Sequence, residues 1–237
     1  MESPDLRIKH ARIVSAYEAH IESFELFQKH VISFFESRSL RKYVHSIRHR
    51  IKDIDHLLEK VERKNAEDLT LPENIRKGEI SPENLFSRIT DIAGVRVLHL
   101  HVSQFEKIHH AISKKIEEGE FVLFESPKAY TWDPESGSFF DKLKIQRELK
   151  ESYYTSIHYV LRPNSRSPAT CEIQVRTLLE EVWGEVDHTM NYPKPISDPH
   201  CREQVRILAR LVGAGTHLAD SIMRRYGSPG QEQGEAN

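Results

Sequence analysis

The sequence lacks an apolar run long enough to span a bilayer, and it lacks a large excess of either charge. A transmembrane helix needs about 20 predominantly apolar residues, so we expect no membrane partner. The chain has 34 Lys and Arg against 36 Asp and Glu, a formal net charge of -2. This balance argues against a general nucleic-acid coat, whose signature is a basic excess, although it leaves room for a local basic pocket.

Cysteines and known phosphate-loop motifs are also scarce. The two cysteines, Cys171 and Cys201, have no disulfide-framework spacing, and the first residues contain no apolar signal core. Both features predict a cytoplasmic protein. No GxxxxGKS or GxxxxGKT run occurs, which excludes a P-loop enzyme. The length of 237 residues suits one large domain or a domain with helical extensions.

Hydrophobic periodicity predicts helices at both ends of the chain. Apolar residues recur at helical spacing from Asp5 to Phe35, and Asp198-Pro199 is a typical helix start. The predicted segments are an N-terminal helix over 1–40, a central domain over 41–195, a C-terminal helix over 196–226 and a disordered tail over 227–237.

The central segment predicts an α+β fold in which a mixed β-sheet of four or five strands is flanked by helices. Residues 43–64 fit one helix, or a strand over 45–52 followed by a helix capped by Asp53. The other expected elements are a helix over 81–88, strands at 93–100 and 121–124, a helix opened by a Ser103/Glu106 capping box, a loop over 65–80 and a longer one over 125–150, a hairpin of 154–161 with 169–175, and a helix launched by a Thr177/Glu180 capping box. The predicted buried faces of the last two helices are Leu179, Val182, Trp183, Val186 and Met190, then Val205, Leu208, Leu211, Val212, Leu218 and Ile222.

Two carboxylates stand beside strand-like apolar runs. Asp91 lies in RITDIAGVRVL and Glu172 opens EIQVRT. Buried strands rarely carry acids unless a partner compensates them. Either acid alone is more simply a strand-end or salt-bridged residue. As a pair, each followed by an arginine (Arg96 and Arg176), they indicate a metal and phosphate site, because Mg²⁺ is usually held by one or two carboxylates plus substrate phosphates.

Basic and aromatic residues surround this pair. In the strand alternative, Arg48, Arg50 and Lys52 share one face, and Lys60 follows on the next helix; a solvated cationic helix face is the simpler interpretation of that segment alone. Tyr153-Tyr154 offers a platform on which a base can stack. Cations at the end of the long loop offer a second phosphate site: Lys142, Lys144, Arg147 and Lys150. Two nucleotides and one metal indicate phosphoryl or pyrophosphoryl transfer.

The motifs RITDIAGVR (88–96), YTSIH (154–158) and EIQVRT (172–177), with Trp183 and His188, resemble the RelA/SpoT alarmone synthetase domain. The resemblance covers about residues 40–195. It implies a nucleotidyltransferase-like fold and a small, single-domain alarmone synthetase. Such enzymes transfer the β,γ-pyrophosphate of ATP to the ribose 3′-hydroxyl of GDP or GTP, make (p)ppGpp and release AMP. No His-Asp dipeptide occurs, so the hydrolase half of the long bifunctional relatives looks absent.

The resemblance also implies roles for individual residues. Asp91 and Glu172 would bind Mg²⁺, and Glu172 would be a general base. Arg50 and Arg96 would sandwich the adenine of ATP, while Lys52 and Lys60 would hold its phosphates. The acceptor nucleotide would contact four residues: Lys150, Tyr154, His158 and Gln174.

Two departures from the family pattern leave the acceptor open. The usual Gly-Tyr-Arg-Ser reads Tyr153-Tyr154-Thr155-Ser156, and Glu181 replaces a neutral amide. The alternatives are the same transfer to an adenine nucleotide or to the tRNA 3′ end, as in toxin-type relatives, and a catalytically inactive nucleotide-binding regulator. tRNA and a second copy of the chain therefore remain candidate partners besides ATP and GDP or GTP.

Overall fold

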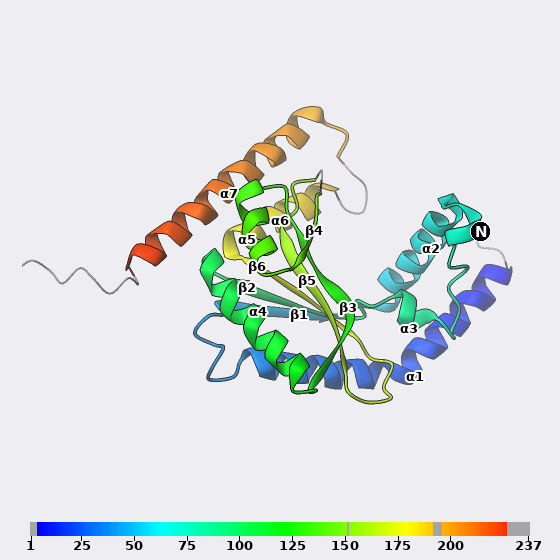
Figure 1. Cartoon of the computed structure of the whole chain (residues 1–237). Coiled ribbons are helices and arrows are strands. Elements are labelled where there is room, and N and C mark those ends of the chain that lie inside the picture. Colours follow the sequence, from blue (N-terminus) through cyan, green and yellow to red (C-terminus); the bar gives the residue numbers. More distant parts are fainter. Residues whose placement is uncertain (1–3, 151, 192–195, 227–237) are drawn as a thin grey trace, which may run out of the picture.

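A computed structural model describes residues 4–150, 152–191 and 196–226 of the chain. Over those residues the fold is α+β, with seven α-helices around one six-stranded mixed sheet (Figure 1). The strands are β1 Ser46–Ile51, β2 Ala93–His99, β3 Phe121–Tyr130, β4 Gln146–Glu148, β5 Ser156–Pro163 and β6 Cys171–Thr177. The helices are α1 Pro4–Phe35, α2 Ile54–Thr70, α3 Leu85–Arg88, α4 Val102–Glu117, α5 Pro134–Lys142, α6 Leu178–Asn191 and α7 Pro199–Tyr226, with a 3-10 turn at Glu73–Ile75. None of the described helices combines the length and apolarity needed to cross a membrane.

The strand order is β1-β2-β6-β5-β3-β4. The pairs β2–β6 and β3–β4 are parallel, while β1–β2, β6–β5 and β5–β3 are antiparallel. The central strands β2 and β6 are therefore far apart in the sequence and adjacent in space. Since register partners in neighbouring strands share a face, this pairing decides which side chains from distant segments meet.

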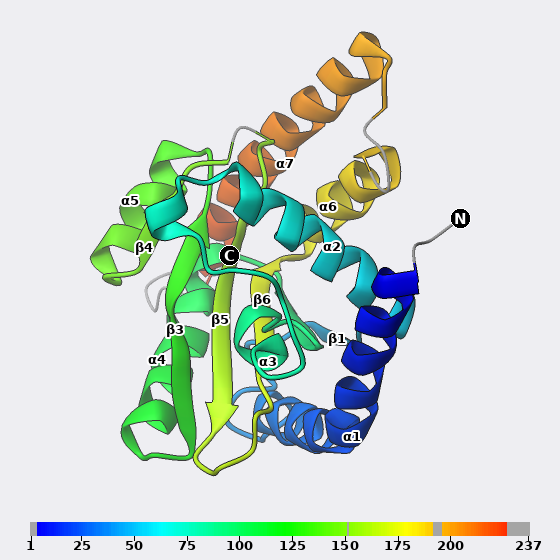
Figure 2. The ribbon, with the colours of Figure 1, turned by 90° about the vertical axis from the view of Figure 1, so that its right-hand side faces the viewer.

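One face of the sheet carries the hydrophobic core. Alternate residues of β2 and β6, such as Val95, Val97, Ile173 and Val175, are almost fully buried, and α1 and α4 contact this sheet (Figures 1 and 2). Helix α1 supplies large aromatic side chains, including Phe27, whose ring meets that of Phe121 of β3 edge-on at 6.0 Å. The opposite face is left for polar side chains.

Residues 43–64 adopt the strand-then-helix alternative. Strand β1 precedes Asp53, whose side chain accepts a hydrogen bond from the His56 amide and caps α2. The helix continues to Thr70, so the prediction of a loop from residue 65 was wrong in its first turns. Asp68, at the end of the helix, is buried and accepts hydrogen bonds from the Lys77 and Gly78 amides, contacts that a local pattern does not reveal.

The predicted loop over 125–150 was largely wrong. Strand β3 continues to Tyr130 through two register shifts opposite β5, and these irregularities interrupt the alternation that marks a strand. Asp133 caps α5 with Pro134 in its first turn, and β4 pairs with β3. The Asp-Pro dipeptide was thus a helix start rather than loop chemistry.

Two capping predictions have different outcomes. Helix α4 begins one residue after His101, which forms its capping box with Gln104, so the Ser103/Glu106 box was wrong; Ser103 instead donates a hydrogen bond to Asp220 of α7. The Thr177/Glu180 box is confirmed, because each residue's amide donates to the other's side chain.

The predicted inner faces of the last two helices were partly wrong. Trp183 is buried, and Val205, Leu208, Val212, Val186 and Met190 pack around it. The side chains that are instead exposed by 38–66% are Leu179, Val182, Leu211, Leu218 and Ile222. Helix α7 turns Val205, Ala209, Thr216 and Asp220 inward. That stripe has the same helical spacing as the exposed one, so periodicity alone does not identify the packed face.

Replacing the buried ring of Phe24 tests the α1 contribution to the core. Phe24 is 0% exposed and packs against Phe86 with ring centroids 5.2 Å apart. We expect Phe24→Ala to lower the free energy of unfolding, measured by urea titration, by about 3–5 kcal/mol. Leu26→Ala is the control, because Leu26 is 60% exposed and its loss should cost about 0.5 kcal/mol or less. Equal effects of the two changes would contradict this core.

Candidate active site

A row of polar side chains crosses the sheet on the face opposite the core. In register, Arg48 of β1 pairs with Arg96 of β2, Arg96 with Gln174 of β6, and Gln174 with His158 of β5. The neighbouring row joins Arg50, Gly94 and Glu172. Residues from four separate sequence segments therefore share one surface because the strands pair in this order.

Asp91 lies two residues before β2 and is held by two lysines. Its Oδ2 atom is 3.2 Å from Nζ of Lys52 and 2.6 Å from Nζ of Lys60. Lys52 directly follows β1 and its amide donates to the Ile92 carbonyl, whereas Lys60 comes from α2. Only 12% of the Asp91 side chain and 7% of that of Lys52 are exposed, so these charges compensate one another largely away from water.

The charges of this cluster shift its pKa values. Burial opposes the ionised form of Asp91, but Lys60 and Lys52 outweigh burial and hold the pKa of Asp91 below its ordinary value. Burial lowers the pKa of Lys52, partly offset by Asp91. At neutral pH the Asp91 carboxylate is thus ionised and ready to bind a cation.

Asp91 and Glu172 line the same cavity, of about 340 Å³, together with Arg50, Arg96 and other residues. A second cavity, of about 540 Å³, is lined by Lys52, Lys60 and again by Asp91. Asp91 therefore lines both cavities: the larger one with the two lysines and the smaller one with Glu172.

The carboxylate oxygens fit a divalent cation. Oδ1 of Asp91 is buried and accepts no hydrogen bond from the described residues, which is unusual for a buried carboxylate oxygen. Within the described part of the chain, no three His, Cys, Asp or Glu side chains converge as a metal site. Two carboxylates suffice for Mg²⁺ only when substrate phosphates complete the coordination, so the protein is suited to a metal that arrives with a nucleotide.

Three arginines meet two glutamates of α6 at one side of the cavity. Oε1 of Glu181 lies 3.3 Å from Nη1 of Arg48 and 3.2 Å from Nη1 of Arg96, while Oε2 pairs with Arg176. Oε1 of Glu185 lies 2.6 Å from Nη1 of Arg96. Glu181, one of the two departures that leave the acceptor open, is 3% exposed and enclosed by guanidinium groups.

The residues predicted to bind the acceptor also lie together. The hydroxyl of Tyr154 and Nε2 of His158 are 2.9 Å apart, and Nε2 of Gln174 donates to Oε1 of Glu172 at 2.7 Å. Nδ1 of His158 is 3.8 Å from Oε2 of Glu172, too far for a hydrogen bond. Burial lowers the pKa of His158 despite Glu172, so its imidazole is neutral at neutral pH.

Lys150 is connected to His158 by the ring of Tyr130, a residue that the sequence analysis did not identify as part of the site. Its Nζ lies 4.6 Å from the ring centroid of Tyr130, and that ring contacts His158 edge-on at 4.7 Å. Lys150 also pairs with Glu148 at 2.6 Å. Arg147, a second cation of the predicted phosphate cluster, instead pairs with Asp141.

Tyr153, where the resemblance to the family leads us to expect a glycine, has an unusual backbone conformation. Tyr153 has a φ of 66°, in the left-handed region that glycine occupies without cost. Its ring packs on Trp132 with centroids 4.9 Å apart, and its hydroxyl accepts a hydrogen bond from Arg210. These contacts hold a tyrosine in a conformation that favours glycine.

The structure brings Asp91 together with Lys52 and Lys60, and Tyr154 with His158. The role of Arg48, Glu185 and Tyr130 was not predicted. The alternation of Arg48 with Arg50 in the sequence indicates that the two share one face of a strand. Its ion pairs with Glu181 and Glu185 of α6 depend on tertiary packing and could not be predicted from the sequence. Tyr130 was hidden in the segment predicted as a loop.

The chain is similar in sequence and in fold to known proteins. The pattern described as the region found in RelA / SpoT proteins matches residues 49–197. The chain is 23% identical over 228 residues to GTP pyrophosphokinase YjbM of Bacillus subtilis (strain 168), covering 94% of this chain and 90% of that protein.

Solved structures share the fold. The small alarmone synthetase 1 of Bacillus subtilis, bound to its product pppGpp, superposes with a TM-score of 0.57 at 18% identity, over 91% of this chain and 96% of that one. A GTP pyrophosphokinase family protein of Streptococcus pneumoniae gives a TM-score of 0.57 at 19% identity, over 89% and 90%. The Bacillus subtilis protein bound to AMPCPP gives 0.53 at 16% identity, over 91% and 96%.

Removing the charge of Glu181 tests the arginine cluster. We expect Glu181→Gln to lower the free energy of unfolding by about 3–5 kcal/mol, because breaking a buried ion pair leaves guanidinium charge uncompensated. Urea titration measures the change. The control is Glu203→Gln on α7, whose partner Arg206 is 54% exposed and whose loss should cost less than about 1 kcal/mol. A Glu181→Gln protein as stable as the control would refute the compensating role.

Proposed function

The chain belongs to the RelA/SpoT family, and we propose that it transfers the β,γ-pyrophosphate of ATP to the ribose 3′-hydroxyl of GDP or GTP, releasing AMP. The observation that carries this proposal is the pair of carboxylates, Asp91 and Glu172, lining one cavity with Arg50 and Arg96. The names of the relatives support it, since one is a GTP pyrophosphokinase and another was solved with pppGpp.

The donor nucleotide would enter along the basic side of the site. Lys52 and Lys60 would hold the phosphates of ATP, because both ammonium groups face the lysine-lined cavity beside Asp91. Arg50 and Arg96 would stack on the adenine. Both line the cavity from neighbouring strands, and a planar guanidinium stacks well on a ring.

Mg²⁺ is the proposed metal, held by Asp91 and Glu172 with the nucleotide phosphates. The buried Oδ1 of Asp91, which has no hydrogen-bond partner within the described ranges of the chain, supports this assignment. When bound, the ion would neutralise charge on the triphosphate and polarise the phosphorus that is attacked.

The protein residues would then position the acceptor and move its proton. Tyr154 would stack on the acceptor base, and Lys150, His158 and Gln174 would line the acceptor site. Glu172 would accept the proton of the 3′-hydroxyl through Oε2, since Oε1 is engaged by Gln174. The 3′ oxygen then bonds to the β-phosphorus, the bond from that phosphorus to the α,β-bridging oxygen breaks, and AMP leaves with that oxygen. Most of the rate would come from positioning and charge neutralisation.

Replacing Asp91 tests the metal assignment. Asp91→Asn keeps the shape but removes the charge, so we expect pyrophosphate transfer to fall at least about 100-fold with unchanged far-ultraviolet circular dichroism. Labelled ATP is incubated with Mg²⁺ and separately with GDP, GTP, ATP and tRNA as acceptors. The control is Asp141→Asn, whose side chain is 52% exposed on α5.

The acceptor panel separates the candidate functions. Product on GDP or GTP with the unmodified protein supports the proposal. Product only on ATP or tRNA would redirect it to those acceptors, and nucleotide binding without product would point to an inactive regulator. Near-normal transfer by a folded Asp91→Asn protein would refute the metal site.

Replacing Tyr154 tests acceptor stacking. We expect Tyr154→Ala to raise the KM for the acceptor about 10- to 100-fold, the usual range for losing one stacking ring, with the affinity for an ATP analogue unchanged. Initial rates at varied acceptor concentration measure the KM, and calorimetric titration measures the affinity for the ATP analogue. Tyr226→Ala is the control, because Tyr226 is 86% exposed on α7. A loss confined to ATP binding would contradict the stacking role.

A further inference from the structure

Tyr153 joins two residues of the proposed acceptor site through its backbone. Its amide donates a hydrogen bond to the carbonyl of Lys150 at 3.1 Å, and Tyr154 follows it directly in the chain. The φ of Tyr153 is 66°, a left-handed conformation that glycine adopts freely and that costs free energy in a residue with a Cβ. The conformation of this one residue therefore sets the direction in which the chain enters Tyr154.

Two side chains from other segments hold the ring of Tyr153. Trp132, in the connection between β3 and α5, packs on it with ring centroids 4.9 Å apart. Nη2 of Arg210 on α7 donates a hydrogen bond to the Tyr153 hydroxyl at 3.0 Å, and the guanidinium carbon lies 5.6 Å from the centre of the ring. These contacts compensate the strained backbone, because such strain persists only where the surrounding structure fixes it.

Helix α7 also approaches the partner of that ring closely. A Cβ added to Gly213 would lie 3.2 Å from Cζ2 of Trp132, so a larger residue there would require a shift of the helix or of the tryptophan. Arg210 and Gly213 are three residues apart, a spacing that places both on one side of a helix. Helix α7 is therefore in contact with both rings that precede Tyr154.

Tyr154 makes two contacts that depend on how the chain leaves Tyr153. Its hydroxyl lies 2.9 Å from Nε2 of His158, and the guanidinium carbon of Arg176 lies 5.9 Å from the centre of its ring. His158 belongs to β5 and Arg176 to β6, so the pairing of these strands fixes both partners. A rotation of the backbone at Tyr153 would move the Tyr154 ring away from both of them.

We propose that Tyr153 is a positioning residue for the acceptor: its ring, held by Trp132 and Arg210, keeps the backbone in the conformation that places Tyr154 in the acceptor site. The inference rests on the proposed function, because it takes Tyr154 as the residue that stacks on the acceptor base. It also gives α7 a role in acceptor binding. A chain with glycine at this position would not need these contacts, since glycine adopts the conformation freely.

Alanine and glycine at position 153 separate the effect of backbone conformation from the effect of lost contacts. Tyr153→Ala and Tyr153→Gly both remove the ring, but only glycine then keeps the left-handed conformation without cost. We expect the acceptor KM to be about 10-fold higher in Tyr153→Ala than in Tyr153→Gly, a ratio equivalent to about 1.4 kcal/mol and within the cost of this conformation for a residue with a Cβ. Initial rates at varied GDP or GTP concentration measure the KM. The affinity for an ATP analogue, measured by calorimetry, should be equal in the two variants.

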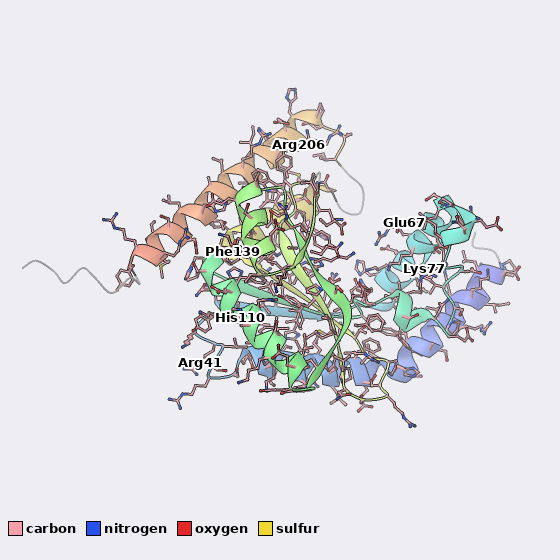
Figure 3. All side chains as sticks on the ribbon, viewed as in Figure 1. Arg41, Glu67, Lys77, His110, Phe139 and Arg206 are labelled. Carbon is pink, nitrogen blue, oxygen red and sulfur yellow. The ribbon has the colours of Figure 1, made fainter. Side chains whose placement is uncertain are left out.

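Removing Arg210 tests the contribution of α7. We expect Arg210→Ala to raise the acceptor KM about 3-fold, the usual effect of losing one exposed contact between a cation and a ring. Combined with Tyr153→Gly it should have no effect, because no ring remains to be held. The matched control is Arg206→Ala, since Arg206 is 54% exposed, lies one turn earlier on α7 (Figure 3) and pairs with Glu203. Thermal unfolding checks that every variant is folded.

The failure of this inference differs from the failure of the proposed function. If the unmodified protein makes no product, but the calorimetric dissociation constants for GDP or GTP follow the expected order among the variants, the proposed function fails and the positioning role stands. Equal KM values in Tyr153→Ala and Tyr153→Gly, with normal transfer by the unmodified protein, overturn the positioning role. A weaker affinity for the ATP analogue in Tyr153→Ala alone also overturns it. An effect of Arg210→Ala that persists in Tyr153→Gly overturns the role of α7.

Discussion

The site depends on the compensation of a buried carboxylate by two lysines from other parts of the chain. Asp91 precedes β2, Lys52 follows β1 and Lys60 lies on α2, so their contact requires that β1 and β2 pair and that α2 begins directly after the strand. An isolated charge in that position would be strongly disfavoured. The same ion pairs keep Asp91 ionised, and its second oxygen accepts no hydrogen bond from any residue that the structure describes.

A second electrostatic balance forms on the other side of the cavity. Arg48, Arg96 and Arg176 lie on three adjacent strands, and like charges so close together repel one another. Glu181 and Glu185 of α6 provide the opposite charge. Helix α6 therefore does more than cover the end of β6. It sets the orientation of the guanidinium groups that face the cavity, and their charges compensate the buried acid at position 181.

How far the sequence predicts the structure varies with the range of the interactions involved. The helix from Asp5, the hairpin partner at Cys171 and the Thr177/Glu180 cap follow from local periodicity and local hydrogen bonds, and the structure confirms them. The structure of segment 125–150 does not follow from local patterns. The bulges of β3 break the alternation of apolar and polar residues, and β4 is a strand only because it pairs with β3. The outer stripe of α7 has the same spacing as the inner one, so only packing against Trp183 and α4 identifies the buried side.

By itself, the sequence determined which groups are available: two acids beside apolar strands, alternating cations on β1 and the motifs that mark the family. These are properties of residue type and spacing. Only the tertiary structure decided which groups meet, because the parallel pairing of β2 with β6 joins segments almost 80 residues apart and the docking of α6 brings Glu181 and Glu185 to the arginines. Such contacts arise from burial and charge compensation across the whole chain, which no local pattern encodes.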